Sequence, residues 1–251
     1  NRLATQLAQS ESPAVLSQTV GDFLKAHRLG RGFTDDYFLP MIACIWSCPT
    51  EQMLAFPMAT LVRFCHNHGL LQVTGRPQWY TVTGGSRQYV QKMIASQPDA
   101  RASTPVTAII RESDGVRVVT ATGVEVFDQV VLACHPHSAL ALLGDGATPD
   151  ERRVLGAIRY QPNRAVLHTD ASVLPSNPKA WAAWNYERAN GGEPGALDQV
   201  CLHYLINRLQ PLPFQTPVIV SLNPIGPIEP TKVLQSFVYE HPIFDASAIA
   251  A

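Results

Sequence analysis

The sequence predicts a mixed fold of helices and sheets, of the α+β or α/β class, from three observations. Residues 1–70 read mainly as apolar or amphipathic helices. Residues 78–106 read as a strand, a glycine turn, a helix and the start of another strand. From residue 165 onward, short strand-like runs are separated by proline-rich joints. We therefore expect a helical part followed by two parts that contain sheet.

Length and composition set the broad class of the protein. A chain of 251 residues with 46% hydrophobic and 16% charged residues is long and apolar enough for a globular core. Its net charge of −1 comes without a run of Lys or Arg, so no nucleic-acid partner is expected. Five cysteines without a disulfide-scaffold spacing fit a reducing, cytoplasmic compartment. No run approaches the roughly 20 apolar residues of a membrane-spanning helix, and no secretory segment is visible.

Helical signals fill the N-terminal part. A helix is expected to start near Thr19 and to end at Leu29-Gly30, where glycine suits a C-cap. Residues 33–46 form a long apolar segment that Pro40 should bend or break, and Phe56-Pro57 opens another helix. These helices are apolar around much of their circumference. Simple helix packing explains that pattern, and so does a cap whose inner wall lines an apolar substrate tunnel.

Cysteine and histidine pairs in this part raise the question of a metal site. Cys44 and Cys48 form one pair, and Cys65 lies beside His66 and His68. Structural zinc sites combine Cys-x2–4-Cys with His-x3–5-His spacings, whereas these pairs are isolated on apolar helices. We interpret the thiols as packing residues and expect no metal here.

A glycine turn marks the centre of the sequence. Residues 78–83 carry strand-type side chains, Gly84 and Gly85 follow, and Ser86 stands at a helix N-cap position. Apolar residues then recur at helical spacing: Tyr89, Val90, Met93 and Ile94. One interpretation is a tight turn before a surface helix. The other is a site where a ligand approaches bare backbone at a helix N-terminus.

Hairpin signals come next. Ser113-Asp114-Gly115 and Thr122-Gly123 are expected turns between alternating strands. Residues 130–133 are continuously apolar, which is typical of a strand buried on both faces of a parallel sheet. Ligands in open α/β sheets bind beyond the carboxyl ends of strands, so the end of this run is a sensible place for a cofactor.

Four phrases carry a family resemblance: AFPMATLVRFCHNHGLLQ, RPQWYTVTGGSRQYV, FDQVVLACHP and NRLQPLPF. The chain resembles the flavin-containing amine oxidase superfamily, which includes monoamine oxidase, protoporphyrinogen oxidase and phytoene desaturase. It is most similar to a bacterial branch of predicted NAD/FAD-binding oxidoreductases. The G-x-G-x-x-G fingerprint that the family carries at its N-terminus is absent here. With a start at Asn1-Arg2-Leu3 and no initiator Met, we expect the central portion of a longer protein.

The resemblance implies FAD as cofactor and a set of residues that hold it. Val106 would meet the adenine or its ribose through backbone atoms. Ala133, Cys134 and His135 would lie near the phosphate-to-ribityl side of the flavin, although Cys134 is equally well interpreted as a small buried filler. The full set of implied cofactor-binding residues is Gly84, Gly85, Ser86, Val106, Ala133, Cys134 and His135.

The resemblance also implies a substrate site between the helical cap and a C-terminal antiparallel sheet. Its candidate residues are Trp46, Phe64, His68, Trp184, Tyr204 and Asn207. Monoamine oxidase carries a lysine on the strand that corresponds to NRAVLHTD, where this chain has only Arg164 and His168. Ordinary amine oxidation is therefore in doubt, and no catalytic residue is assigned.

These implications give an expected organisation and function. Residues 1–77 form the helical cap, 78–145 part of the FAD-binding domain with its sheet, and 146–251 a mixed α/β substrate-binding portion. The full-length protein would be an FAD-dependent, desaturase-like oxidoreductase that oxidises a hydrophobic molecule, with fatty-acyl lipids as candidates, by hydride transfer to flavin. The excerpt alone would be inactive. A flavin amine oxidase and a flavin-free binding or scaffold protein are the alternatives. Peripheral membrane contact, the electron acceptor and the oligomeric state stay open.

Overall fold

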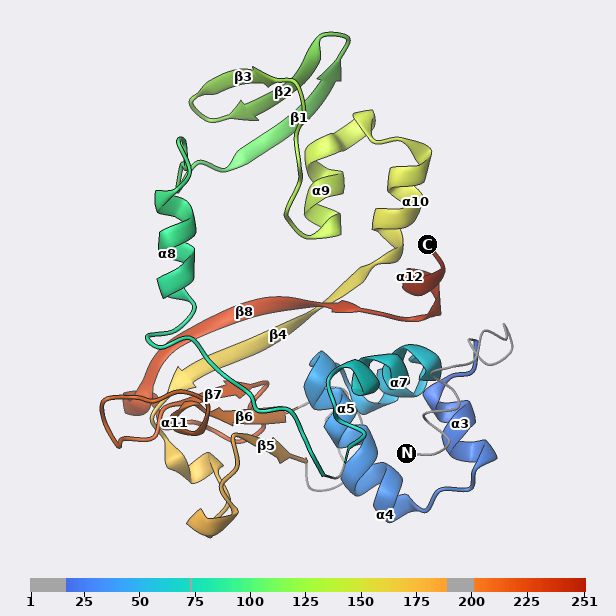
Figure 1. The fold of residues 1–251 in the computed structure, drawn as a ribbon, viewed down its shortest axis with the longest axis vertical. Helices are drawn as coiled ribbons and strands as arrows, with labels where there is room; N and C mark the ends of the chain where they lie inside the picture. The colour runs from blue at the N-terminus through green and yellow to red at the C-terminus, as the bar shows by residue number, and fades with distance from the viewer. Residues whose placement is uncertain (1–16, 73, 189–200) are drawn as a thin grey trace. The chain divides into compact units, whose positions relative to one another are not determined.

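The computed structural model describes residues 17–72, 74–188 and 201–251 (Figure 1). The chain packs as two compact units. The first comprises Asn1–Gly85 and Tyr160–Ala246, and the second comprises Ser86–Arg159 and Ser247–Ala251. The predicted division into 1–77, 78–145 and 146–251 describes functional parts of the chain, whereas these two units are defined by packing. The division stays a prediction.

The helical part of the first unit follows most of the N-terminal signals. The predicted end of the first helix at Leu29-Gly30 is wrong, because the helix ends at Ala26 with His27 as C-cap and Gly30, with φ of −69°, is the N-cap of the next helix. Its elements are α3 (Val20–Ala26), α4 (Arg31–Phe33), a π-helical turn (Thr34–Phe38), α5 (Leu39–Trp46), α6 (Thr50–Leu54) and α7 (Met58–Asn67). Thr19 starts α3 with a capping box, because its hydroxyl accepts the Asp22 N–H at 3.1 Å and the Asp22 carboxylate accepts the Thr19 N–H at 3.2 Å. Ser47 ends α5 in the left-handed conformation, with φ of 52°.

Pro40 disturbs the segment 33–46, as predicted, without ending the helix. The chain stays helical, but the π-helical turn Thr34–Phe38 directly precedes α5, which has Pro40 in its first turn. Proline has no N–H to donate, and its ring crowds the carbonyl one turn earlier. A wider turn at this point accommodates both constraints.

A five-stranded sheet forms the rest of the first unit, in the order β5-β6-β7-β4-β8. Its strands are β4 (Arg159–His168), β5 (Trp184–Glu187), β6 (Cys201–Leu205), β7 (Ile219–Leu222) and β8 (Val233–Ile243). β5 pairs antiparallel with β6, β6 with β7 and β7 with β4. The predicted C-terminal strands are therefore confirmed. The short helix α11 (Ile206–Leu209) connects β6 to the segment before β7.

One face of this sheet packs against the helices. Ala165, Leu202 and Leu222 belong to the same buried cluster as the cap residues Ile42 and Leu61. Side chains alternate along a strand, so the residues in between point to the other face. That second face is polar at its centre.

The second unit is smaller. Its elements are α8 (Arg87–Ala95), β1 (Val106–Glu112), β2 (Gly115–Thr120), β3 (Gly123–Phe127), α9 (Pro136–Leu143), α10 (Pro149–Ala157) and most of α12 (Ala246–Ala250). β1, β2 and β3 form an antiparallel sheet whose two turns lie where they were predicted. Ile109, Leu143 and Ala147 form its core. The predicted mixed fold is thus confirmed, with antiparallel strand pairs in both sheets.

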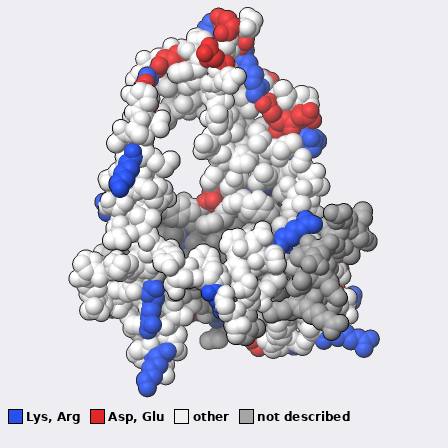
Figure 2. All heavy atoms as spheres, viewed as in Figure 1, with Lys and Arg blue, Asp and Glu red and all other residues white. Residues whose placement is uncertain are grey.

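Charged side chains of the second unit pair across its surface. Figure 2 shows acidic and basic groups side by side over this unit. Arg111 of β1 binds Glu151 of α10 at 2.5 Å, and Arg117 binds Glu112 within the first hairpin at 2.6 Å. Exposed pairs of this kind contribute little to stability individually.

Two predicted strands are absent from the structure. Residues 78–83 and 130–133 have no strand pairing in the described part of the chain, and Val131 is 91% exposed. Strand-type side chains are not sufficient, because a strand forms only beside a partner whose N–H and C=O groups it can bond. The helix after the glycine turn is confirmed as α8, but Ser86 adopts a helical conformation and its side chain makes no cap hydrogen bond.

Within the described residues, no helix combines the length and the apolar character that crossing a bilayer requires.

Candidate functional site

A cavity of about 980 Å³ lies within the first unit. That volume is at the upper end of the range usual for small-molecule sites. Side chains from the helical cap, from residues 78–81 and from β5, β6 and α11 line it. Most of the wall is aromatic or aliphatic, and representative lining residues are Tyr37, Met41, Phe64, Trp79, Trp184 and Tyr186.

The sheet supplies one wall through the alternation of β5 and β6. Trp184 and Tyr186 point to the cavity from β5, and Leu202 lies opposite Tyr186 in the β6 register. Tyr204 is two residues further along β6, opposite Trp184 in the register, and meets the Trp184 ring edge-on, with centroids 5.4 Å apart. Burial raises the pKa of the Tyr186 and Tyr204 phenols, so both stay neutral near pH 7.

Helix α7 supplies another part of the wall. Phe64 and the residue that caps this helix, His68, are four positions apart, so their rings share one helix face and stack with centroids 4.0 Å apart. The Nδ1–H of His68 donates to the Phe64 carbonyl at 2.9 Å, so the neutral ring carries no proton on Nε2. The cavity wall therefore offers one imidazole nitrogen as an acceptor in an otherwise apolar surface.

Two charged groups at the cavity differ in their partners. Asp36 binds Arg188, with Oδ1 and Nη1 3.4 Å apart. Arg208 makes no hydrogen bond or ion pair with another described residue. Of these two groups, the guanidinium is the one left to meet a ligand, and it favours an anionic group over a cationic one.

The predicted substrate residues fall into two layers. Phe64, His68 and Trp184 line the cavity. Trp46 packs against Phe64, with ring centroids 4.7 Å apart, and Tyr204 packs beside Trp184, its register partner across β5 and β6. The structure therefore brings these five predicted residues into one region.

Asn207 has a structural role in the turn after β6. Its Oδ1 accepts the Val218 N–H at 2.7 Å, and its Nδ2 donates to the Thr216 carbonyl at 3.0 Å. Asn207 is not among the described residues that line the cavity. The sequence identified a polar residue beside a strand, but two backbone partners already use its amide.

The predicted cofactor residues are divided between the units. Gly84 and Gly85 end the first unit with φ of 80° and 82°, a conformation that suits glycine. A Cβ at Gly85 would meet nothing within 4 Å, so the backbone there is open to an incoming molecule. The other predicted residues belong to the second unit: Ser86, Val106, Ala133, Cys134 and His135.

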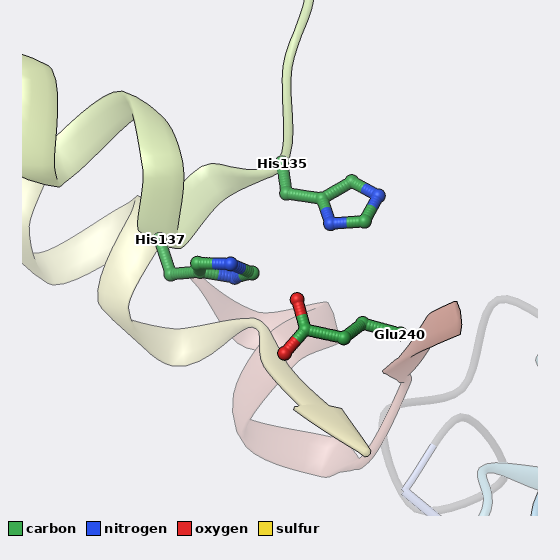
Figure 3. Close-up of side chains that lie close together, drawn as sticks. All are labelled: His135, His137 and Glu240. Carbon is green, nitrogen blue, oxygen red and sulfur yellow. The ribbon is translucent and has the colours of Figure 1, made fainter. Parts of the chain in front are cut away.

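Cys134 and His135 lie just before α9. Cys134 is exposed, so its interpretation as a small buried filler is wrong. His135 occupies the N-cap position of α9, and its ring meets that of His137 at 5.5 Å in an edge-on arrangement (Figure 3). Both residues present polar rings at the start of this helix.

Sequence reasoning missed a buried polar network on the second face of the five-stranded sheet. His168, His203 and Ser221 come from β4, β6 and β7, and each is at most 1% exposed. The Ser221 Oγ lies 2.7 Å from His168 Nε2 and 2.6 Å from His203 Nδ1. The presence of these polar residues within otherwise apolar strand runs was the sequence signal that could have indicated the network.

One backbone group sets the direction of this network. The Asp170 N–H donates to His168 Nδ1 at 3.1 Å, so the neutral His168 ring carries its proton on Nε2 and donates to Ser221. The Ser221 hydroxyl can then donate to His203 Nδ1, which leaves the proton of His203 on Nε2. Burial lowers the pKa of His168, in agreement with a neutral ring.

The network ends at an acid and a thiol. His203 Nε2 lies 2.9 Å from the Glu187 Oε2, and the Cys201 Sγ lies 3.5 Å from that oxygen and 3.6 Å from His203 Nε2. Glu187 is partly exposed, whereas Cys201 is buried. Burial raises the pKa of the Cys201 thiol to about 12, so it is protonated near pH 7 in this arrangement.

Comparison with known proteins establishes the family. Residues 17–185, well over half of the chain, match the family model described as flavin containing amine oxidoreductase. The chain therefore belongs to the family of flavin-containing amine oxidoreductases. No curated protein sequence matches it.

Two solved structures have a similar fold. The CLA-producing fatty acid isomerase from P. acnes aligns with a TM-score of 0.56 and 15% identity, over 89% of this chain and 54% of that protein. A protein from Exiguobacterium sp. 255-15 that is described as a protoporphyrinogen oxidase aligns with a TM-score of 0.56 and 15% identity, over 95% and 58%. The chain thus spans little more than half the length of either protein.

Proposed function

We propose that the protein containing this chain is an FAD-dependent oxidoreductase that oxidises a hydrophobic substrate by hydride transfer to the flavin. The single observation that carries the substrate class is the cavity of about 980 Å³ with its mainly aromatic and aliphatic wall. Membership of the flavin-containing amine oxidoreductase family supports the cofactor and the redox class. Five free cysteines agree with a reducing, cytoplasmic location, which is part of the proposal.

FAD supplies the hydride acceptor when it is bound, and the protein supplies positioning. The open backbone at Gly84 and Gly85 fits the close approach of a large cofactor, because no side chain occupies the space where a Cβ would point at Gly85. The remaining contacts are proposed for Ser86, Val106 and the segment 133–135. Their backbone groups and side chains would orient the cofactor without taking part in the chemistry.

The cavity favours an apolar substrate with an anionic group over an amine. Burial of each methylene contributes about 0.8 kcal/mol before losses, which is roughly fourfold in binding. Arg208 is available to a carboxylate, whereas Asp36 is already bound to Arg188 and is less able to hold an ammonium group. A fatty acid or fatty-acyl lipid meets both requirements, and its desaturation is the finer form of the proposal.

A flavin amine oxidase is the second candidate. Its supporting observation is the aromatic wall formed by Tyr37, Trp79 and Trp184, because such rings also attract cations. A flavin-free binding or scaffold protein is the third, and it would have the same cavity without bound flavin.

Anaerobic reduction of the flavin in the full-length holoprotein distinguishes the three candidates. We expect long-chain fatty acids to bleach the flavin, with affinity that rises along a chain-length series, and benzylamine to leave it oxidised. Bleaching by small primary amines with no response to fatty acids would establish the amine oxidase instead. Purification of a correctly folded full-length protein without flavin, and without uptake of added FAD, would establish the third candidate.

A matched pair of glycine variants tests the cofactor contact. Gly85 and Gly75 both have positive φ, at 82° and 67°, and both have open space where a Cβ would point. Gly85→Ala and Gly75→Ala therefore both place a side chain on left-handed backbone without a steric clash. We expect the flavin content of the full-length protein to fall in Gly85→Ala alone. Equal flavin content in the two variants would remove Gly85 from the cofactor site.

A further inference from the structure

We propose that Glu187, Cys201 and His203 form a binding site for one Zn²⁺ ion on the polar face of the five-stranded sheet. The cavity is lined by Trp184 and Leu202, which alternate with these residues along β5 and β6. Alternation places the two sets on opposite faces of the sheet. The metal site is therefore separate from the proposed substrate site and does not depend on bound flavin.

The ligand atoms already lie close to tetrahedral spacing. Zn–S bonds are about 2.3 Å and Zn–N and Zn–O bonds about 2.0–2.2 Å, so ligand atoms in a tetrahedron are about 3.3–3.6 Å apart. The Cys201 Sγ lies 3.6 Å from His203 Nε2 and 3.5 Å from the Glu187 Oε2. Only the third distance, 2.9 Å between nitrogen and oxygen, has to open. The Glu187 side chain is 42% exposed, so it has room to move by that amount.

Paired strands hold these ligands in place. Glu187 and Cys201 are register partners across β5 and β6, and His203 follows Cys201 on the same face. Cys201 and His203 are each 1% exposed, so their rotamers are fixed by packing. The half-exposed Glu187 leaves one side open to solvent. Three protein ligands with one open position are typical of zinc sites that bind a further molecule.

A neighbouring group supports the buried imidazole ligand. Ser221 holds His203 through Nδ1, the nitrogen that a metal at Nε2 leaves free. On binding, the Cys201 proton leaves to solvent and the His203 proton moves to Nδ1. The Ser221 oxygen has two lone pairs, so it can accept from His168 and His203 together.

The mixed set of sulfur, nitrogen and oxygen selects the class of metal. A thiolate disfavours Mg²⁺ and Ca²⁺, which take oxygen ligands, and a neutral imidazole with a carboxylate suits Zn²⁺ and Co²⁺. The competing explanation is a purely structural cluster in which acid, imidazole and thiol satisfy one another. The two explanations predict opposite responses to added metal.

Titration of the purified protein with Co²⁺ tests the proposal, because Co²⁺ reports a thiolate ligand through a sulfur-to-metal charge-transfer band. We expect one equivalent to produce that band and one equivalent of Zn²⁺ to abolish it. Cys201→Ser should remove the band and weaken Zn²⁺ binding by more than about 100-fold. Loss of a direct ligand should cost more than the roughly 10–100-fold that loss of a partner outside the ligand set costs. Ser221→Ala should keep the band and weaken Zn²⁺ binding by about 10–100-fold.

Two further variants keep the test decisive. Cys65→Ser changes another buried cysteine, outside the cluster, and should leave the band and the affinity unchanged. Glu187→Gln alters the partly exposed ligand, so it should fold even if Cys201→Ser does not, and it should weaken Zn²⁺ binding at least tenfold. Absence of the band in the wild type would overturn the proposal. So would a band that survives in Cys201→Ser, or unchanged Zn²⁺ affinity in Glu187→Gln.

Discussion

Replacement of Ser221 by alanine tests how much the buried network contributes to the stability of the first unit. The Ser221 hydroxyl is fully buried and bridges His168 Nε2 and His203 Nδ1 at 2.7 and 2.6 Å. Both rings are themselves buried, and the Asp170 N–H prevents His168 from turning its proton to Nδ1. Ser221→Ala therefore leaves one buried donor and one buried acceptor without a partner.

The magnitude follows from those two groups. A buried polar group left unsatisfied costs about 1–3 kcal/mol, so two such groups cost about 2–6 kcal/mol. Removal of the hydroxyl itself from a buried site offsets part of this cost, because that group no longer has to be desolvated. We expect Ser221→Ala to lower the free energy of unfolding by about 3 kcal/mol. This is a large fraction of the 5–15 kcal/mol typical of a whole domain.

Urea unfolding with a chelator present measures this change without any contribution from bound metal. Ser236→Ala, at an exposed position in β8, is the matched control and should change the free energy of unfolding by no more than about 0.5 kcal/mol. A loss below about 1 kcal/mol in Ser221→Ala would refute the reasoning. It would mean that the two imidazoles find other partners when the hydroxyl is removed.

Three further predictions concern the fold. Gly115→Ala should destabilise the second unit by about 1–3 kcal/mol more than Gly123→Ala, measured by thermal unfolding. Both glycines have φ near 150°, but a Cβ at Gly115 would lie 2.7 Å from the Phe127 carbonyl oxygen, while Gly123 faces open space; equal costs would contradict this. Burial lowers the pKa of His168 in the folded state. As the pH falls, the unfolded state therefore takes up a proton on His168 at a higher pH than the folded state does. The free energy of unfolding should then fall as the pH drops below about 6.5, the ordinary histidine value, and His168→Gln should reduce that slope in chelator-treated protein; an unchanged slope would count against a neutral buried ring. Thr148→Ala removes a capping box at the start of α10 and should cost about 1 kcal/mol by urea unfolding, and no loss would show that the cap is dispensable.

Local sequence signals predicted the elements that depend on near neighbours. The helix start predicted near Thr19 rests on the side chain of Asp22, three residues away, and the capping box is present. The hairpin at Ser113-Asp114 needs only a two-residue turn followed by Gly115, and it forms where expected. In each case the partners lie three residues apart in the sequence, so the local pattern is sufficient.

Part of the candidate substrate site was also visible in the sequence. Phe64 and His68 share a helix face because they are four residues apart, and Trp184 alternates toward the cavity with its strand. Asn207 was chosen by residue type alone, and the structure shows that backbone partners occupy its amide. Periodicity identifies a face, but it does not show which polar groups on that face are already used.

The sequence by itself determined the helices, the hairpins, the apolar character of the cap and the family to which the chain belongs. Tertiary structure alone decided which strand-like runs became strands, because pairing depends on partners that are distant in sequence. Residues 78–83 and 130–133 lack such partners among the described residues. Tertiary structure also assembled His168, His203 and Ser221 from three strands, with bonded partners up to 53 positions apart in the sequence. No local pattern encodes such a distance, since strand order and register, set by the packing of the whole unit, place those side chains together.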